Sequence, residues 1–124
     1  MKRFFLTMSL FLCLPVFADW QYIATENESN NEFFLDFETL RKDGSLRRIW
    51  QVVNLGTSEY GWLSIRSMME FDCKNETVQG LARMAFSDKL ANGKVLHKSD
   101  DRGTKSYIPP NSVASTQLRE VCKR

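Results

Sequence analysis

A single histidine, His97, limits the catalytic chemistry that this sequence can support. A nucleophilic triad needs a histidine beside a nucleophile and a carboxylate, and no motif in the chain places such residues near His97. The pair Asp100-Asp101 lacks the further oxygen ligands of a calcium loop. The six glycines form no phosphate-binding pattern. We therefore expect a protein without catalytic residues, bound metal or cofactor.

Four cations lie within eight residues and could bind an anionic group. Arg41-Lys42 precede and Arg47-Arg48 follow Asp43-Gly44, a dipeptide typical of a tight hairpin turn. Such a hairpin could be a plain solvated tip or a contact patch for an acidic protein partner. We carry the second interpretation forward, with Arg41, Lys42, Arg47 and Arg48 as candidate ligand-binding residues.

Trp62 is a further candidate for binding. It lies near the start of a segment of alternating apolar and polar residues, Tyr60 to Lys74, and it falls with Met68 on the face expected to be mostly wet. Exposed aromatic and methionine side chains are enriched at interfaces. A second buried layer would explain both residues equally well.

Residues 1–18 have the layout of a secretory signal peptide. A basic pair is followed by an apolar stretch from Phe4 to Leu14, and Val16-Phe17-Ala18 fits a cleavage site. The apolar stretch is shorter than the roughly 20 residues of a membrane-spanning helix. We therefore expect no stable membrane span, and one exported domain, residues 19–124, in the periplasm or associated with the outer membrane at the cell surface.

Cleavage would change both the charge and the cysteine count. It removes Lys2 and Arg3, which leaves 15 basic and 15 acidic residues. A neutral domain lacks the positive field that would attract nucleic acid. The two remaining cysteines, Cys73 and Cys122, predict a disulfide, since an even number in an exported chain normally pairs. With these two bonded, one histidine leaves too few ligands for a zinc site.

Period-2 hydrophobic patterns between Trp20 and Lys98 predict an antiparallel meander. The expected strands cover residues 20–25, 32–37, 45–54, 60–74, 76–86 and 94–98, with one helical turn at 38–42 and an exposed loop at 99–108. The fourth segment directs one apolar set to the core: Leu63, Ile65, Met69, Phe71 and Cys73.

Residues 113–122 predict a C-terminal helix after Pro109-Pro110, with Asn111 or Ser112 as its cap. Its apolar stripe consists of Ala114, Leu118, Val121 and Cys122. Since Cys73 and Cys122 both face the core, their bond would hold this helix against the fourth strand. The predicted fold is α+β and mainly β: an antiparallel sheet of about six strands, a C-terminal helix packed on one face, and one disulfide.

In this order, the motifs resemble the surface-adhesin protein E family of Gram-negative bacteria. The matching residues are Trp20, Leu35-Asp36, Thr39 to Gly44, Ile49-Trp50, the run Ser64 to Cys73, Ile108 to Ser112, and Cys122. The resemblance implies a mainly antiparallel sheet with a C-terminal helix and the same Cys73–Cys122 bond. It also suggests dimerisation.

For function, the resemblance implies a non-enzymatic binding module that adheres to host extracellular-matrix or serum proteins. The alternative is a periplasmic inhibitor or immunity-type protein that blocks an enzyme with a protruding loop, for which residues 99–108 are the candidate. A broad basic or aromatic face would favour the first function, and a protruding loop the second.

Overall fold

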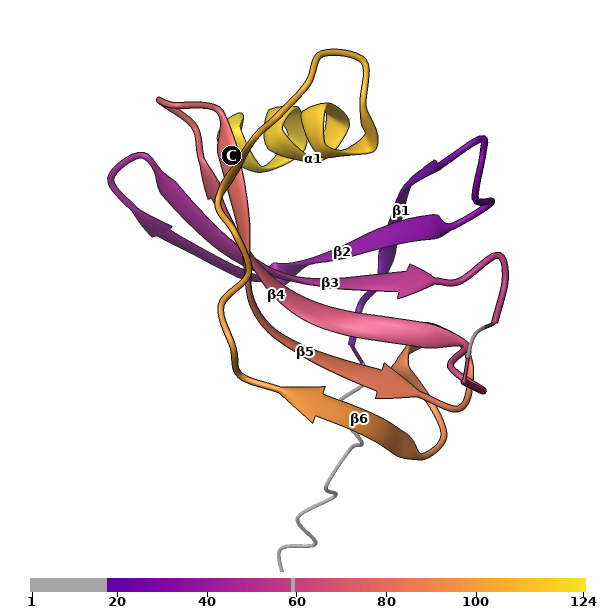
Figure 1. The fold of residues 1–124 in the computed structure, drawn as a ribbon. Helices are drawn as coiled ribbons and strands as arrows, with labels where there is room; N and C mark the ends of the chain where they lie inside the picture. Colours follow the sequence, from indigo (N-terminus) through magenta and orange to yellow (C-terminus); the bar gives the residue numbers. More distant parts are fainter. Residues whose placement is uncertain (1–17, 59) are drawn as a thin grey trace, which may run out of the picture.

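The strands follow one another across a single antiparallel sheet in the computed structural model, which describes residues 18–58 and 60–124 (Figure 1). The predicted signal peptide lies outside these residues except for Ala18. The sheet order is β1-β2-β3-β4-β5-β6, with bounds Gln21–Thr25, Glu32–Asp43, Leu46–Asn54, Ser64–Asp72, Thr77–Phe86 and Val95–Ser99. Helix α1, Val113–Cys122, lies on one face of the sheet (Figure 1). The predicted fold class is confirmed.

The helix covers the core at one end of the sheet. Leu35, Ile49 and Phe71 alternate onto the face below α1 and pack with Val121 of the helix. Helix α1 begins at Val113 because Ser112 and Ser115 form a reciprocal capping box, in which each hydroxyl accepts the other residue's backbone N–H. Of the predicted apolar stripe, Val121 is fully buried, and Leu118 and Cys122 pack against the core.

A polar contact also joins the helix to the sheet. The Nε2 of Gln117 donates to the Oε1 of Gln51 at 2.6 Å, and both residues are buried. Gln117 lies outside the predicted stripe, because periodicity in hydrophobicity does not detect a buried polar side chain that finds a partner. None of the helices in the described part of the chain is long and apolar enough to cross a membrane.

The helical turn predicted at residues 38–42 is wrong. Strand β2 continues through this region with a bulge, since Asp36 pairs with Trp50 but the next paired residue, Arg41, lies opposite Arg48. Side chains satisfy the displaced backbone: Asp36 Oδ1 accepts from the Glu38 N–H, and Thr39 Oγ1 accepts from the Trp50 N–H. Sequence periodicity suggests a helical turn at such a bulge because both interrupt the period of two.

The face of β4 opposite α1 is less exposed to solvent than predicted. Ser64 and Glu70 alternate onto the face opposite α1, yet both are buried. The short helix η1, Lys89–Ala91, packs against β3 and β4 there, and Ser64 Oγ accepts from the Ala91 N–H and donates to the Asp88 carbonyl.

Residues 99–108 are mostly exposed, as predicted, but they are anchored to the sheet. Strand β7, Ser106–Tyr107, pairs with β5, and the Gly103 N–H donates to the Gly80 carbonyl at 2.9 Å. The loop therefore runs along the edge of β5.

Candidate binding surfaces

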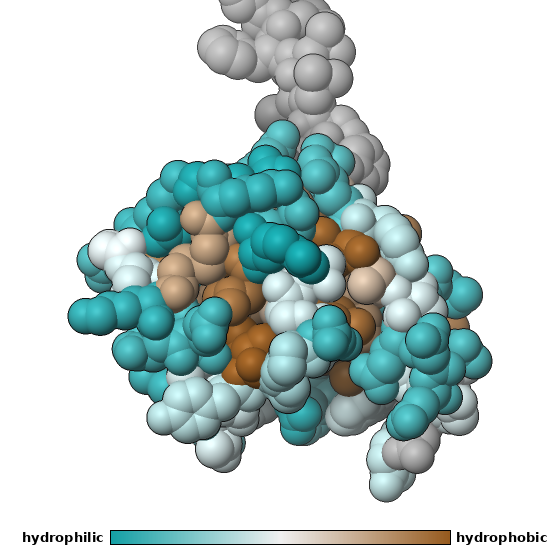
Figure 2. All heavy atoms as spheres, turned by 90° about the horizontal axis from the view of Figure 1, so that it is seen from above, coloured by the Kyte–Doolittle hydropathy of each residue, from teal (hydrophilic) through white to brown (hydrophobic). Residues whose placement is uncertain are grey.

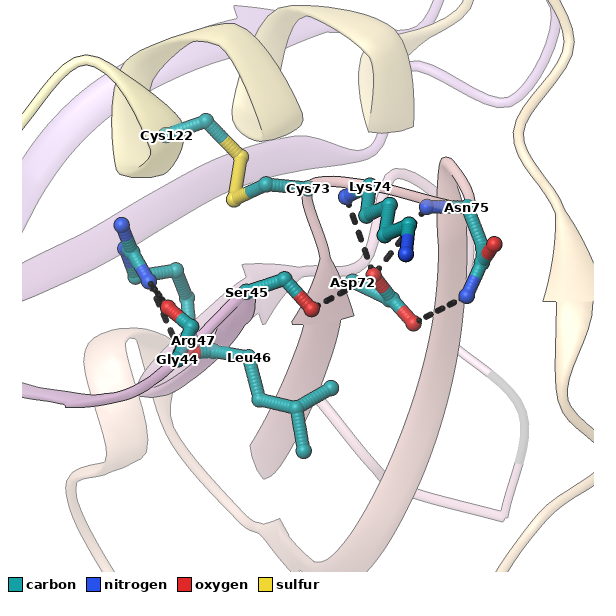
Figure 3. The surroundings of a disulfide bond; sticks show 9 residues. All are labelled: Gly44, Ser45, Leu46, Arg47, Asp72, Cys73, Lys74, Asn75 and Cys122. Atoms are coloured by element: carbon teal, nitrogen blue, oxygen red, sulfur yellow. Dashed lines mark hydrogen bonds between the residues drawn. A yellow bond between two sulfur atoms is a disulfide. The ribbon is translucent and has the colours of Figure 1, made fainter.

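The disulfide joins α1 to the chain just after β4 (Figure 3). Cys73 and Cys122 are bonded, with their Cα atoms 5.8 Å apart, which confirms the predicted pair. The Cys73 N–H donates to the Ser45 carbonyl, so the same point is also tied to the β2–β3 hairpin. The disulfide thus fixes three segments at one end of the sheet.

Asp72 organises the turn beside the disulfide. Its carboxylate accepts the backbone N–H groups of Lys74 and Asn75, the amide of Asn75 and the hydroxyl of Ser45 (Figure 3). These donors, led by the Asn75 backbone, hold the pKa of Asp72 below its usual value because they favour its charged form. The turn that presents Cys73 therefore depends on an ionised carboxylate.

We expect Asp72→Asn to lower the melting temperature at pH 7, with a difference from wild type that shrinks as the pH falls. A carboxyl group whose pKa is lowered by folding contributes its stability above its unfolded pKa, about 3.9. It loses that contribution as the pH falls through the folded value. Thermal melts between pH 7 and pH 2.5 measure this, with exposed Asp43→Asn as the control. A temperature difference that stays constant over the whole range would contradict the role of the charge.

The four candidate cations lie on the β2–β3 hairpin, but on its two faces. Arg41 pairs with Arg48, and Lys42 pairs with Arg47. Since Arg48 alternates with the core residue Ile49, the Arg41–Arg48 pair projects away from α1 and the Lys42–Arg47 pair projects towards it. The hairpin therefore carries two consecutive cross-strand pairs of like charge, an arrangement that weakens a sheet.

Two of these cations are engaged within the protein. The Nε of Arg48 donates to the Oε2 of nearly buried Glu70 at 2.7 Å. The Nη1 of Arg47 donates to the carbonyls of Gly44 and Leu46. Arg41 and Lys42 are exposed and make no ion pair with a described residue, so they are the cations best placed to meet a partner.

Trp62 lies at the opposite end of the sheet from these cations. It precedes β4, whereas Arg48 lies opposite Glu70 near the end of that nine-residue strand, so about 25 Å separates them. The prediction that Trp62 belongs to the outer face is wrong: it lines a pocket with Ile65, on the same face as α1, and it stacks on His97 at 5.2 Å between ring centroids. Glycine at position 61, with a positive φ of 76°, ends the period-2 geometry on which that prediction depended.

The face opposite α1 holds a cation that sequence reasoning missed. The guanidinium of Arg66 lies 5.4 Å from the Trp50 ring and 5.3 Å from the Phe86 ring. The signal available in the sequence was the spacing of two between Arg66 and Met68, which places Arg66 on the same outer face as Met68. These two cation–π contacts, together with the bond from its Nη2 to the Sδ of Met84 at 3.3 Å, hold the Arg66 side chain against apolar neighbours.

Among the described residues, no group of three or more histidine, cysteine or acidic side chains is arranged to hold a metal ion. His97 instead stacks on Trp62.

The chain is similar to solved structures of Haemophilus influenzae protein E. One crystal form matches with a TM-score of 0.67 at 17% identity, over 89% of this chain and 94% of that one. Another gives 0.66 at 17%, over 89% and 91%, and a structure from a non-typeable strain gives 0.63 at 17%, over 82% and 75%. None of the curated proteins compared with the chain matches it.

The order of strands, the C-terminal helix and the similarity to these structures agree with the family model for surface-adhesin protein E, which matches residues 20–123. The match extends over nearly the whole predicted domain and includes both bonded cysteines. This chain therefore belongs to the surface-adhesin protein E family.

Proposed function

We propose that this protein is an exported, non-enzymatic binding module that recruits an acidic segment of a host extracellular-matrix or serum protein through its β2–β3 hairpin. Family membership supports adhesion as the kind of function. The main observation in favour of the hairpin as the binding site is its two consecutive like-charge pairs, Arg41–Arg48 and Lys42–Arg47. Such pairs weaken the sheet. Glu70 already pairs with Arg48, and an anionic partner would offset the remaining charge of Arg41 and Lys42.

The charge of the whole domain supports a local site. Once residues 1–18 are removed, 15 basic and 15 acidic residues remain, so the domain has no general attraction for anions. A cationic tip on a neutral protein raises the encounter rate with one acidic partner. Export through a cleaved signal peptide would place the domain in the periplasm or at the cell surface, where an adhesin acts.

The structure does not favour the alternative of an inhibitor with a protruding loop. Residues 99–108 are tied to β5 through Gly103 and through the Gln79 Nε2, which donates to the Gly103 carbonyl at 2.9 Å. A loop held along a sheet edge is poorly shaped to enter an active-site cleft.

The proposed function is tested by surface binding of the mature domain, residues 19–124, to purified extracellular-matrix and serum proteins. We expect saturable binding to at least one of them, weakened by salt. An unrelated domain of similar size and net charge serves as the control for nonspecific adsorption. Absence of binding to every matrix and serum protein would refute the adhesin function.

A further inference from the structure

A pocket of about 350 Å³ lies at the end of the sheet away from the basic hairpin. The turn between β1 and β2 forms one wall, and the connection between β3 and β4 forms the other. Its described lining is Ser29, Asn31, Leu55, Thr57, Tyr60, Trp62 and Ile65, none of which is charged. Figure 2 views the α1 side of the molecule, where apolar side chains come to the surface in the middle of a hydrophilic rim.

The two walls are locked together before any ligand binds. The Gly56 N–H of the second wall donates to the Oδ1 of Asn31 in the first wall at 2.9 Å. The second wall is closed on itself by the Leu55 N–H, which donates to the Leu63 carbonyl at 3.0 Å. Gly56 lies so close to the first turn that a Cβ atom there would collide with the Ser29 carbonyl. A pocket fixed by its own backbone contacts loses little freedom on binding, which favours affinity.

One of the two aromatic rings of this site, that of Tyr60, is held in an unfavourable conformation. The Tyr60 side chain is 87% exposed, and its backbone has a positive φ of 57°, which is unfavourable for a non-glycine residue. The Tyr60 ring lies 6.0 Å from the Trp62 ring, which is supported on another side by His97. Strained backbone conformations of this kind cluster at ligand-binding sites.

Hydrogen-bonding groups lie beside these rings. Asn31 uses its Oδ1 for Gly56, which leaves its Nδ2 hydrogens to be donated. The hydroxyl of Ser29 accepts from the Asn31 N–H and can still donate, and Thr57 adds an exposed hydroxyl. The pocket therefore combines aromatic surface with neutral donors and acceptors.

We propose that this pocket binds a neutral hexopyranose unit of a glycan, independently of the basic hairpin. A pyranose ring presents a C–H face that packs on an aromatic ring, and hydroxyl groups at its edge that need neutral amide and hydroxyl partners. The volume is at the lower end of the range for ligand pockets, roughly 300–1,000 Å³, and so suits one or two sugar units. A hydrocarbon ligand without polar groups would leave the polar groups of Ser29, Asn31 and Thr57 without partners.

The test is titration of the mature domain with the methyl glycosides of galactose, mannose, glucose and N-acetylglucosamine, followed by NMR of the tryptophan indole N–H signals. We expect at least one glycoside to shift the Trp62 signal saturably. Tyr60→Ala should raise the dissociation constant roughly tenfold, through loss of one stacking ring. Tyr107→Ala, an equally exposed tyrosine on β7, should leave it unchanged.

Four outcomes would overturn the proposal: no shift with any glycoside, equal affinity in Tyr60→Ala, a response only to the anionic sugar sialyllactose, or a response only to the apolar peptide acetyl-Leu-Phe-Val-amide. Because Tyr60 is exposed, its replacement should leave the fold intact, which the remaining NMR signals verify. Failure here would leave the hairpin's function unaffected, since the two sites lie at opposite ends of the sheet.

Discussion

Replacing both Cys73 and Cys122 by serine should lower the free energy of unfolding by about 4 kcal/mol. The bond joins residues 49 positions apart, and opening so long a loop returns much chain entropy to the unfolded state. A domain of this size has roughly 5–15 kcal/mol of total stability. The disulfide therefore accounts for roughly a quarter to four-fifths of the protein's stability.

Urea unfolding of the double variant, followed by tryptophan fluorescence, measures the loss. Wild type treated with dithiothreitol should unfold at the same urea concentration as the variant, because both lack the same constraint. A variant whose midpoint equals that of oxidised wild type would show that the disulfide does not stabilise this fold.

Phe71→Ala should cost about 3–5 kcal/mol. Phe71 has 0% exposure and contributes the largest of the fully buried side chains, in a cluster with Leu35, Ile49 and Val121. Truncation removes apolar burial at the point where the sheet meets α1, and the neighbouring strands prevent the cavity from collapsing.

The same urea experiment measures this loss, with Tyr107→Ala as the matched aromatic truncation. Tyr107 is 84% exposed, so its replacement should change the stability by no more than about 0.5 kcal/mol. Similar losses in the two variants would mean that the core does not centre on Phe71.

Local patterns were sufficient to predict the fold. The helix has the predicted bounds because its start depends on a serine cap and its end on a short stripe, both local in sequence. Asp43-Gly44 correctly located the hairpin, since Gly44 adopts a positive φ of 57°. The cysteines could be paired because two separate periodicities directed them to one core.

Features that depend on tertiary contacts could not be predicted in this way. The bulge in β2 requires Thr39 to reach the Trp50 backbone, and the burial of Gln117 requires Gln51 on another strand. The same limit applies to the candidate site. Charge spacing located the hairpin cations, but strand register was needed to show that they divide between two faces and that Arg48 is paired with Glu70. The pocket at Tyr60 depends on a turn about 30 residues earlier in the chain, through Asn31.

The register also indicates which cations a binding experiment should change. Reversing Arg48 would place a second carboxylate beside Glu70, and reversing Arg47 would disturb its bonds to the turn. In contrast, Arg41→Glu and Lys42→Glu would each create an opposite-charge pair across the hairpin. These pairs should stabilise the sheet by about 0.2–1 kcal/mol each while removing the positive tip.

The most direct test is therefore the association rate of Arg41→Glu/Lys42→Glu with the matrix or serum protein that wild type binds, measured across a salt series. The control is Lys89→Glu/Lys94→Glu, which makes the same change in net charge at exposed positions near the other end of the sheet. We predict that the hairpin variant associates about tenfold more slowly at physiological salt. The difference should fade towards 1 M salt, because the Debye length over which charges act becomes shorter. The melting temperature of the variant should not be lowered. Equal association rates for the two variants would contradict the hairpin as the binding site.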